Sequence, residues 1–64
     1  MKGKITRLIQ DKGFGFIKGE DNTEYFFHRS AVKNISFEEL IDGQDVEFKD
    51  DEGPKGPRAE DVFV

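Results

Sequence analysis

The sequence predicts an all-β domain in which five short strands close into one small antiparallel barrel. Three observations support this prediction. Apolar residues recur mostly at the two-residue spacing of a strand rather than at helical spacing. Clusters of Gly, Pro, Asn and Asp separate the apolar segments. A chain of 64 residues is long enough for one domain, residues 1–64, and too short for a second core.

The strand pattern occurs in separate segments that are bounded by turn-forming residues. These segments are residues 2–10, 14–18, 23–28, 44–49 and 58–64. In the first segment the alternation slips at Leu8–Ile9, which indicates an irregularity in that strand. Residues 19–22, Gly-Glu-Asp-Asn, are a turn that joins the second and third segments into a hairpin. Residues 50–57 contain two glycines and two prolines, and we expect them to form a loop.

The longer connection at residues 29–43 contains the only helical signal. Ser36-Phe37-Glu38-Glu39 has the Ser-x-x-Glu form of a capping box. Asp42-Gly43 should end this helix within about one turn. Five strands in an open sheet would leave two edges exposed, and closing the sheet removes them. The predicted fold is therefore a five-stranded Greek-key barrel of the oligonucleotide/oligosaccharide-binding type.

Composition excludes several kinds of site. The chain has no cysteine, so it has no disulfide and no zinc site built on cysteine pairs, and its single histidine rules out a histidine-rich metal site. We therefore expect neither metal nor cofactor. There is no apolar run of about 18 residues and no signal peptide pattern. From these features we expect a cytoplasmic protein with no membrane partner. We also expect a monomer, although no pattern in the sequence reports on oligomeric state.

Charge is distributed unevenly along the chain. The net charge is −4, which by itself argues against a polyanionic partner. Residues 1–33, however, carry seven Lys/Arg and four acids, for a net charge of +3, whereas residues 34–64 carry three Lys/Arg and ten acids, for a net charge of −7. The local field steers a ligand to its site, so the basic half can still attract an anion. The acidic half could simply serve solubility.

Aromatic residues concentrate between Lys12 and Ser30, in the basic half. Side chains alternate between the two faces of a strand, so Phe14 and Phe16 share one face, as do Phe26 and His28 in the next strand of the hairpin. If Ile17, Tyr25 and Phe27 point into the barrel, the outward face carries three phenylalanines and the histidine: Phe14, Phe16, Phe26 and His28.

The opposite assignment would place the Phe14 set inside and expose Ile17, Tyr25 and Phe27. Aromatic rings are exposed in either case. We favour the first assignment because His28, Lys12 and Lys18 share its outward face and prefer water, and because Gly15 could not fill a core.

An exposed aromatic cluster usually marks a binding site. Bases of a single strand can stack on the rings while nearby cations contact the phosphates. A duplex should bind poorly because its bases are not free to stack. The candidate cations are Lys4, Arg7, Lys12, Lys18, Arg29 and Lys55; for Lys4 and Lys18 in particular, an ordinary solvated lysine is the simpler interpretation.

Several motifs together resemble the bacterial cold-shock protein family, and the resemblance covers essentially the whole chain. They are Gly3-Lys4-Ile5, Lys12-Gly13-Phe14-Gly15-Phe16-Ile17, Phe26-Phe27-His28 with Ser30-Ala31-Val32, Asp42-Gly43-Gln44-Asp45-Val46, and the stretch from Gly53 to Val62. "GFGF" alone would be a weak signal, but the set is specific. Members of this family are five-stranded barrels.

The resemblance implies a binder of single-stranded RNA and DNA that acts as an RNA chaperone, often with a preference for pyrimidine-rich stretches. The family's base-stacking residues correspond to Phe14, Phe16, Phe26, His28 and Phe37, and a basic contact corresponds to Lys12. Phe37 could instead cap the core beside the short helical turn.

Two departures from the family pattern replace aromatic residues with arginines. The tryptophan of the family's first strand falls at Arg7, and the aromatic residue after the second motif's histidine falls at Arg29. Arginine can stack on a base and adds charge. We therefore expect Arg7, Arg29, Lys12 and Lys55 to supply phosphate contacts, with weaker stacking and a steeper salt dependence of binding.

Two other functions compete with nucleic-acid binding. His28 beside Glu24 could mimic the acid–base pair of a ribonuclease, but one histidine without a nucleophile is a thin basis for catalysis, and we expect no enzyme. The other is a protein-interaction barrel that uses the same aromatic surface against another protein.

Overall fold

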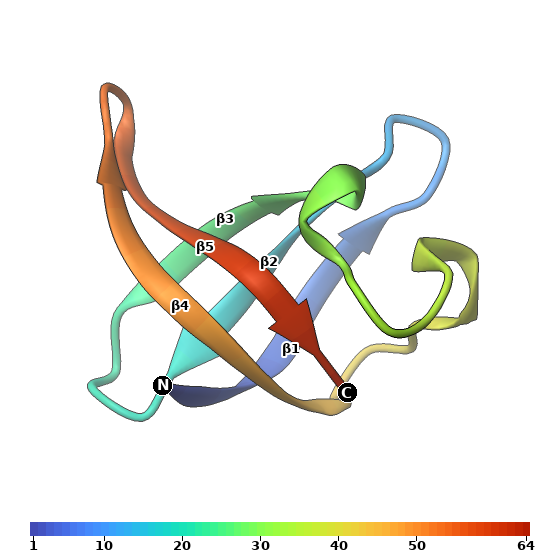
Figure 1. Cartoon of the computed structure of the whole chain (residues 1–64), viewed down its shortest axis with the longest axis horizontal. Helices are drawn as coiled ribbons and strands as arrows, with labels where there is room; N and C mark the ends of the chain where they lie inside the picture. Colours follow the sequence, from blue (N-terminus) through green and yellow to red (C-terminus); the bar gives the residue numbers. More distant parts are fainter.

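The computed structural model describes all 64 residues as a closed barrel with two short helical turns (Figure 1). Its strands are β1 (Lys2–Ile9), β2 (Phe14–Gly19), β3 (Glu24–His28), β4 (Asp45–Gly53) and β5 (Gly56–Phe63). Their order around the barrel is β1-β2-β3-β5-β4, and β1 pairs with β4 to close it. The predicted all-β barrel is confirmed.

One strand pair departs from the predicted antiparallel arrangement. Neighbouring strands are antiparallel except β3 and β5, which are parallel and meet at Phe26 and Arg58. The reason is topological, because an odd number of strands cannot alternate in direction all the way around a closed barrel. The parallel pair is also the most sparsely bonded junction, with a single register pair between the named strands.

The core is formed by alternate residues of the strands together with residues of the long connection. Ile17, Tyr25 and Phe27 point inward, as the favoured assignment predicted. The buried side chains form one cluster: Ile5, Ile17, Tyr25, Phe27, Phe37, Leu40, Val46, Phe48, Ala59 and Val62. No polar or charged side chain is buried. The barrel wall therefore carries its polar residues and any binding surface on the outside.

The irregularity in β1 lies closer to the N-terminus than the sequence indicated. The register with β2 shifts between Ile5 and Arg7, so Thr6 is the extra residue of a bulge, whereas the alternation had pointed to Leu8–Ile9. A one-residue shift reverses which residues face outward beyond it. Arg7 and Ile9 consequently oppose Phe16 and Phe14, and Leu8 packs against the core.

The predicted loop at residues 50–57 is mostly strand. β4 continues to Gly53 and β5 begins at Gly56, so only Pro54 and Lys55 form the tip of the hairpin. This hairpin projects beyond the barrel at the upper left of Figure 1. Water reaches both of its faces there, which is why charged residues are tolerated in paired strands. Gly56 has φ +120°, a conformation that residues with a side chain rarely adopt.

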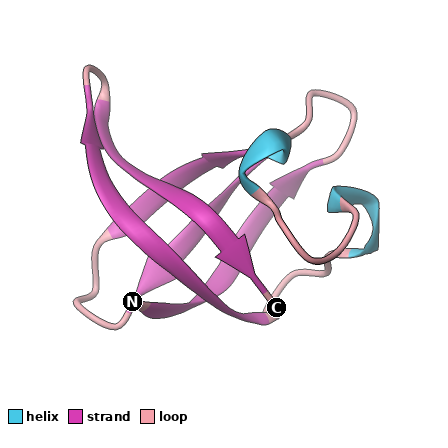
Figure 2. Cartoon of the chain, in the orientation of Figure 1, coloured by secondary structure: helices cyan, strands magenta, loops and turns pink.

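Helical structure is limited to two 3₁₀ turns, shown in cyan in Figure 2: η1 (Arg29–Ala31) and η2 (Phe37–Glu39). The helical turn predicted after Ser36 is therefore present, but Ser36 makes no side-chain capping hydrogen bond, so the capping box does not form. η1 was not predicted. It begins after His28, whose side chain accepts the Ser30 N–H.

A short hydrogen bond fastens the β2–β3 turn to the barrel. The Tyr25 hydroxyl donates to Asp21 Oδ2 at 2.6 Å, and the Thr23 N–H donates to Asp21 Oδ1 at 3.1 Å. The bond between Tyr25 and Asp21 raises the pKa of Tyr25 to about 12 and holds the pKa of Asp21 below its usual value. The turn thus has its own stabilising contact, separate from the outer face of the sheet.

Candidate nucleic-acid interface

The outer face of β2 and β3 carries a cluster of aromatic side chains, which we call the platform: Phe14, Phe16, Phe26 and His28. Phe14 lies opposite His28 across the two strands, and Phe16 lies opposite Phe26. The ring centroids are 5.4 Å apart for Phe14–Phe26, 6.0 Å for Phe16–Phe26 and 6.2 Å for Phe14–Phe16. These spacings are favourable for aromatic pairs, so each ring holds the next one in place.

The platform rings are accessible to solvent. Phe26 is 39% exposed, while Phe14 and Phe16 are half-buried because they lean on one another. Gly15 lies between these two rings on the inward face. A Cβ there would come within 2.7 Å of the Arg7 carbonyl oxygen and 2.9 Å of Phe27 Cε1. The glycine therefore lets β2 run directly over Phe27 and present both phenylalanines outward.

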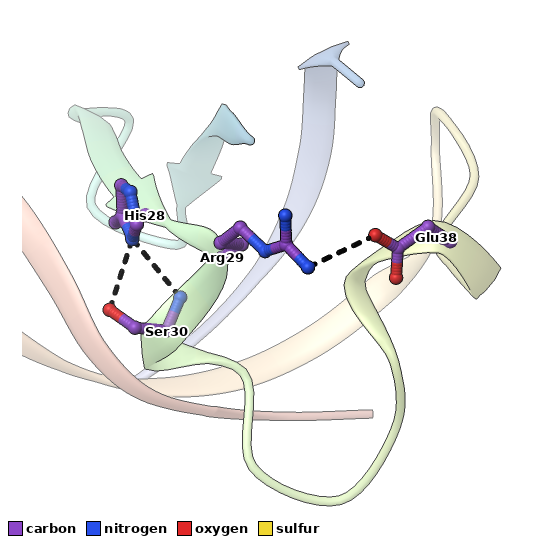
Figure 3. A network of polar contacts seen from close by, with 4 residues as sticks. All are labelled: His28, Arg29, Ser30 and Glu38. Atoms are coloured by element: carbon purple, nitrogen blue, oxygen red, sulfur yellow. Dashed lines mark hydrogen bonds and ion pairs between the residues drawn. The ribbon is translucent and has the colours of Figure 1, made fainter. Parts of the chain in front are cut away.

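His28 ends the platform at the side of η1. Its Nδ1 accepts the Ser30 backbone N–H at 3.2 Å and lies 3.0 Å from Ser30 Oγ (Figure 3). A neutral ring that accepts at Nδ1 carries its proton on Nε2. The exposed ring therefore offers a flat face for stacking and an Nε2–H donor at its edge. No carboxylate forms an ion pair with the ring, and Glu24, at the other end of β3, accepts from the Thr6 hydroxyl at 3.2 Å.

Arg29 points away from His28 toward η2 (Figure 3). Its Nη2 lies 3.3 Å from Glu38 Oε2, and both side chains are more than half exposed. Its stem lies against Gly13, where a Cβ would come within 2.7 Å of Arg29 Cδ. The guanidinium is thus beside the platform, but its charge is shared with an internal carboxylate.

Two of the other predicted cations lie away from the rings: Lys4 pairs with Asp45, and Lys18 lies opposite Glu24. The remaining three lie nearer to the platform. Arg7 faces outward opposite Phe16 because of the bulge at Thr6, and Lys12 lies in the turn that precedes Phe14. Lys55 is at the tip of the β4–β5 hairpin. None of these three belongs to an ion pair; the ion pairs are Lys4–Asp45, Arg29–Glu38, Lys33–Asp61 and Arg58–Glu60.

Phe37 does not lie on the platform. Its side chain is only 4% exposed, and its ring centroid is 5.9 Å from that of Phe27. The stacking role expected for Phe37 is therefore corrected to the alternative, a core residue beneath η2. A short connection gives no period from which to infer which way its residues point, so the sequence could not decide this.

A concavity of about 520 Å³ lies between the platform and the hairpin tip. Phe16 and Phe26 form one wall, and the residues from Gly53 to Arg58 form the other. Arg58 is the residue that the sequence missed here, because β3 and β5 meet only in the folded barrel. Ile9 faces outward opposite Phe14, because the bulge lies at Thr6.

Other kinds of site find no support in the geometry. No group of three or more His, Cys, Asp or Glu side chains converges as a metal ion requires. The helical elements are too short and too polar for any of them to cross a membrane. What the surface does offer is rings, unpaired cations and a neighbouring concavity.

Comparison with known proteins agrees with this surface. The family described as the 'Cold-shock' DNA-binding domain matches residues 1–64. Cold shock protein 2 of Lactiplantibacillus plantarum is 48% identical over 60 residues, which cover 94% of this chain and 91% of that protein. Cold shock-like protein CspE of Buchnera aphidicola is 44% identical over 64 residues, covering 98% and 93%. The cold shock-like protein of Thermotoga maritima is 42% identical over 64 residues, covering 100% and 97%. The chain therefore belongs to the cold-shock domain family, whose domain binds nucleic acid.

Proposed function

We propose that this chain is a cytoplasmic monomer that binds single-stranded RNA and single-stranded DNA and acts as an RNA chaperone, keeping transcripts unpaired. The observation that carries the proposal is the platform of Phe14, Phe16, Phe26 and His28, whose mutually supported rings face solvent on one side of the barrel. The description of its family, the 'Cold-shock' DNA-binding domain, supports nucleic-acid binding.

Stacking supplies the attraction and the selectivity for single strands. Each base that stacks on an aromatic side chain contributes roughly 1–3 kcal/mol to the free energy of binding. All bases can stack, because each has a flat π face. In a duplex the bases are already stacked and paired, so they cannot reach the rings without unpairing. A protein that binds only unpaired bases shifts RNA toward its unpaired state, which is the chaperone activity. We also propose that pyrimidine-rich stretches are preferred, because pyrimidines are the easiest bases to unstack from their neighbours.

Cations around the platform supply the contacts to phosphates. Arg7, Lys12 and Lys55 are free of ion pairs and lie at different sides of the rings. For a single strand, the logarithm of the binding constant falls with a slope of about −0.7 per phosphate contact against the logarithm of salt concentration. Three such contacts predict a slope of roughly −2, or about a 20-fold loss of affinity for a fourfold rise in salt.

The test is fluorescence anisotropy of a labelled pyrimidine heptamer at two salt concentrations, beside a matching duplex. The chain has no tryptophan, so the label must be on the oligonucleotide. We expect saturable binding of the single strand and not of the duplex. Phe16→Ala should weaken binding by roughly 5- to 150-fold, which corresponds to the stacking of one base.

Phe63→Ala provides the matched control, because Phe63 is also an exposed phenylalanine, 45% accessible, but lies on β5 outside the platform. It should leave the affinity unchanged. Chaperone activity is then measured as opening of an RNA hairpin labelled at both ends. If Phe16→Ala bound the heptamer as tightly as the unchanged protein, the platform would not be the nucleic-acid site, and a protein partner would be the better proposal.

A further inference from the structure

Arg58 occupies a defined position beside the platform. It lies opposite Phe26 across the parallel β3–β5 junction and opposite Asp51 across the β4–β5 pair. Its stem lies against Gly53, where a Cβ would come within 2.7 Å of Arg58 Cδ. Its Nε lies 3.4 Å from Glu60 Oε2. Packing on one side and an ion pair on the other therefore restrain the guanidinium at the edge of the concavity.

The polar side chains that line this concavity can only donate hydrogen bonds. The Arg58 side chain has no partner other than Glu60, and Lys55 is the other charged group in the lining. Phe16, Phe26, Pro54 and Pro57 provide flat apolar walls. An occupant should therefore have an apolar face and hydrogen-bond acceptors along its edge, which describes a nucleobase.

Guanine fits a donor fork better than the other bases. Its O6 and N7 are adjacent acceptors that match the paired N–H groups of an arginine. Adenine places the N6 amino donor next to N7, and uracil and thymine offer an isolated O4 there. Cytosine presents its N4 amino donor on the edge that corresponds to the guanine acceptors. Its own adjacent acceptors, N3 and O2, lie on another edge, so cytosine is the base that the experiment must compare with guanine.

We propose that Arg58 makes the concavity a guanine-selective subsite, so that a strand stacked on the platform is bound best when one guanine enters beside Phe26. This inference rests on the proposed single-strand binding, and it adds a specificity that stacking alone does not supply. Arg58 acts through the geometry of its fork. A lysine at the same position would keep the charge but lose the paired donors.

The experiment uses four labelled heptamers, in which the central base of a thymidine run is guanine, adenine, cytosine or 7-deazaguanine. A thymidine run on both sides lets the strand slide until the central base reaches the concavity. For the unchanged protein we expect the guanine strand to bind about 5- to 150-fold more tightly than the adenine strand. The 7-deazaguanine strand, which lacks only N7, should lose most of this advantage.

Arg58→Lys should reduce the ratio of guanine to adenine affinity to about one and leave the affinity for the adenine strand unchanged. Arg7→Lys is the matched control, since it alters an arginine at another edge of the platform and should change all four affinities alike. The proposal would be overturned if the unchanged protein bound the guanine strand no more tightly than the adenine or the cytosine strand. It would also be overturned if Arg58→Lys kept the preference for guanine over adenine, or if the 7-deazaguanine strand bound as tightly as the guanine strand. Binding of all strands without discrimination would overturn this subsite alone, whereas binding of none would overturn the proposed function as well.

Discussion

Replacing Glu38 with glutamine should tighten nucleic-acid binding. Glu38 Oε2 lies 3.3 Å from Arg29 Nη2, next to the platform, so its carboxylate occupies the place that a phosphate would take on Arg29 (Figure 3). To contact a phosphate through this Nη2, Arg29 must first give up the ion pair. Glu38→Gln keeps the shape of the side chain and removes the competing charge.

The exposure of the pair limits the size of the effect. The two side chains are 57% and 60% accessible, so water and salt screen their attraction. Exposed ion pairs contribute about 0.2–1 kcal/mol, which converts to a gain in affinity of about 1.4- to 5-fold. One additional phosphate contact should also steepen the salt slope by about 0.7.

The assay is the heptamer titration at several salt concentrations, with two controls. Glu39→Gln removes the same charge from the same 3₁₀ turn, but Glu39 belongs to no ion pair. Arg29→Gln combined with Glu38→Gln completes a double-mutant cycle, which isolates the coupling between the two side chains. The gain from Glu38→Gln should disappear when Arg29 is absent.

Two results would refute this reasoning. If Glu39→Gln tightened binding as much as Glu38→Gln, the effect would be one of net charge and not of the ion pair. If Glu38→Gln left the affinity unchanged while Arg29→Gln weakened it, Arg29 would reach the phosphates without leaving Glu38.

Three further predictions concern the fold. Phe37→Ala should lower the free energy of unfolding by about 3–5 kcal/mol, because it empties a core position, and thermal unfolding measures this loss. Phe37→Leu should stay folded and keep its affinity for the heptamer, which anisotropy measures. Gly15→Ala should lower the melting temperature, at a cost of about 1–3 kcal/mol, because its Cβ would meet the Arg7 carbonyl and Phe27, whereas unchanged thermal unfolding would show that β2 can shift freely. The free energy of unfolding should have its full value between the ordinary pKa values of the two groups, 3.8 for Asp21 and 10.0 for Tyr25. It should fall as pH rises from 10.0 to about 12, because the raised pKa of Tyr25 means that the fold favours its protonated form. It should also fall as pH drops below 3.8 through the lowered pKa of Asp21, and Tyr25→Phe, followed by chemical denaturation across pH, should remove the alkaline loss.

Alternation along a strand is a local property, and it determined most of the candidate binding surface. Phe14 and Phe16 are two residues apart, as are Phe26 and His28, and a short turn pairs their strands. The same alternation put Ile17, Tyr25 and Phe27 into the core. A reader of the sequence alone could therefore place the rings on the surface, because neither the side-chain period nor the hairpin depends on remote residues.

Other features of the interface depend on contacts between segments remote in the sequence. The position of the bulge at Thr6, which turns Arg7 outward, is determined by the pairing of β1 with both β2 and β4. The burial of Phe37 depends on how the long connection folds back so that its ring packs against Phe27.

The sequence by itself determined the all-β class, the order of the strands along the chain and the faces of β2 and β3, because each follows from spacing within a few residues. Only the tertiary structure decided that β3 and β5 lie side by side in parallel, that Arg58 therefore meets Phe26, and that Arg29 turns to Glu38. Barrel closure brings these residues together, and the direction of a long, flexible side chain is set by the partner it finds there.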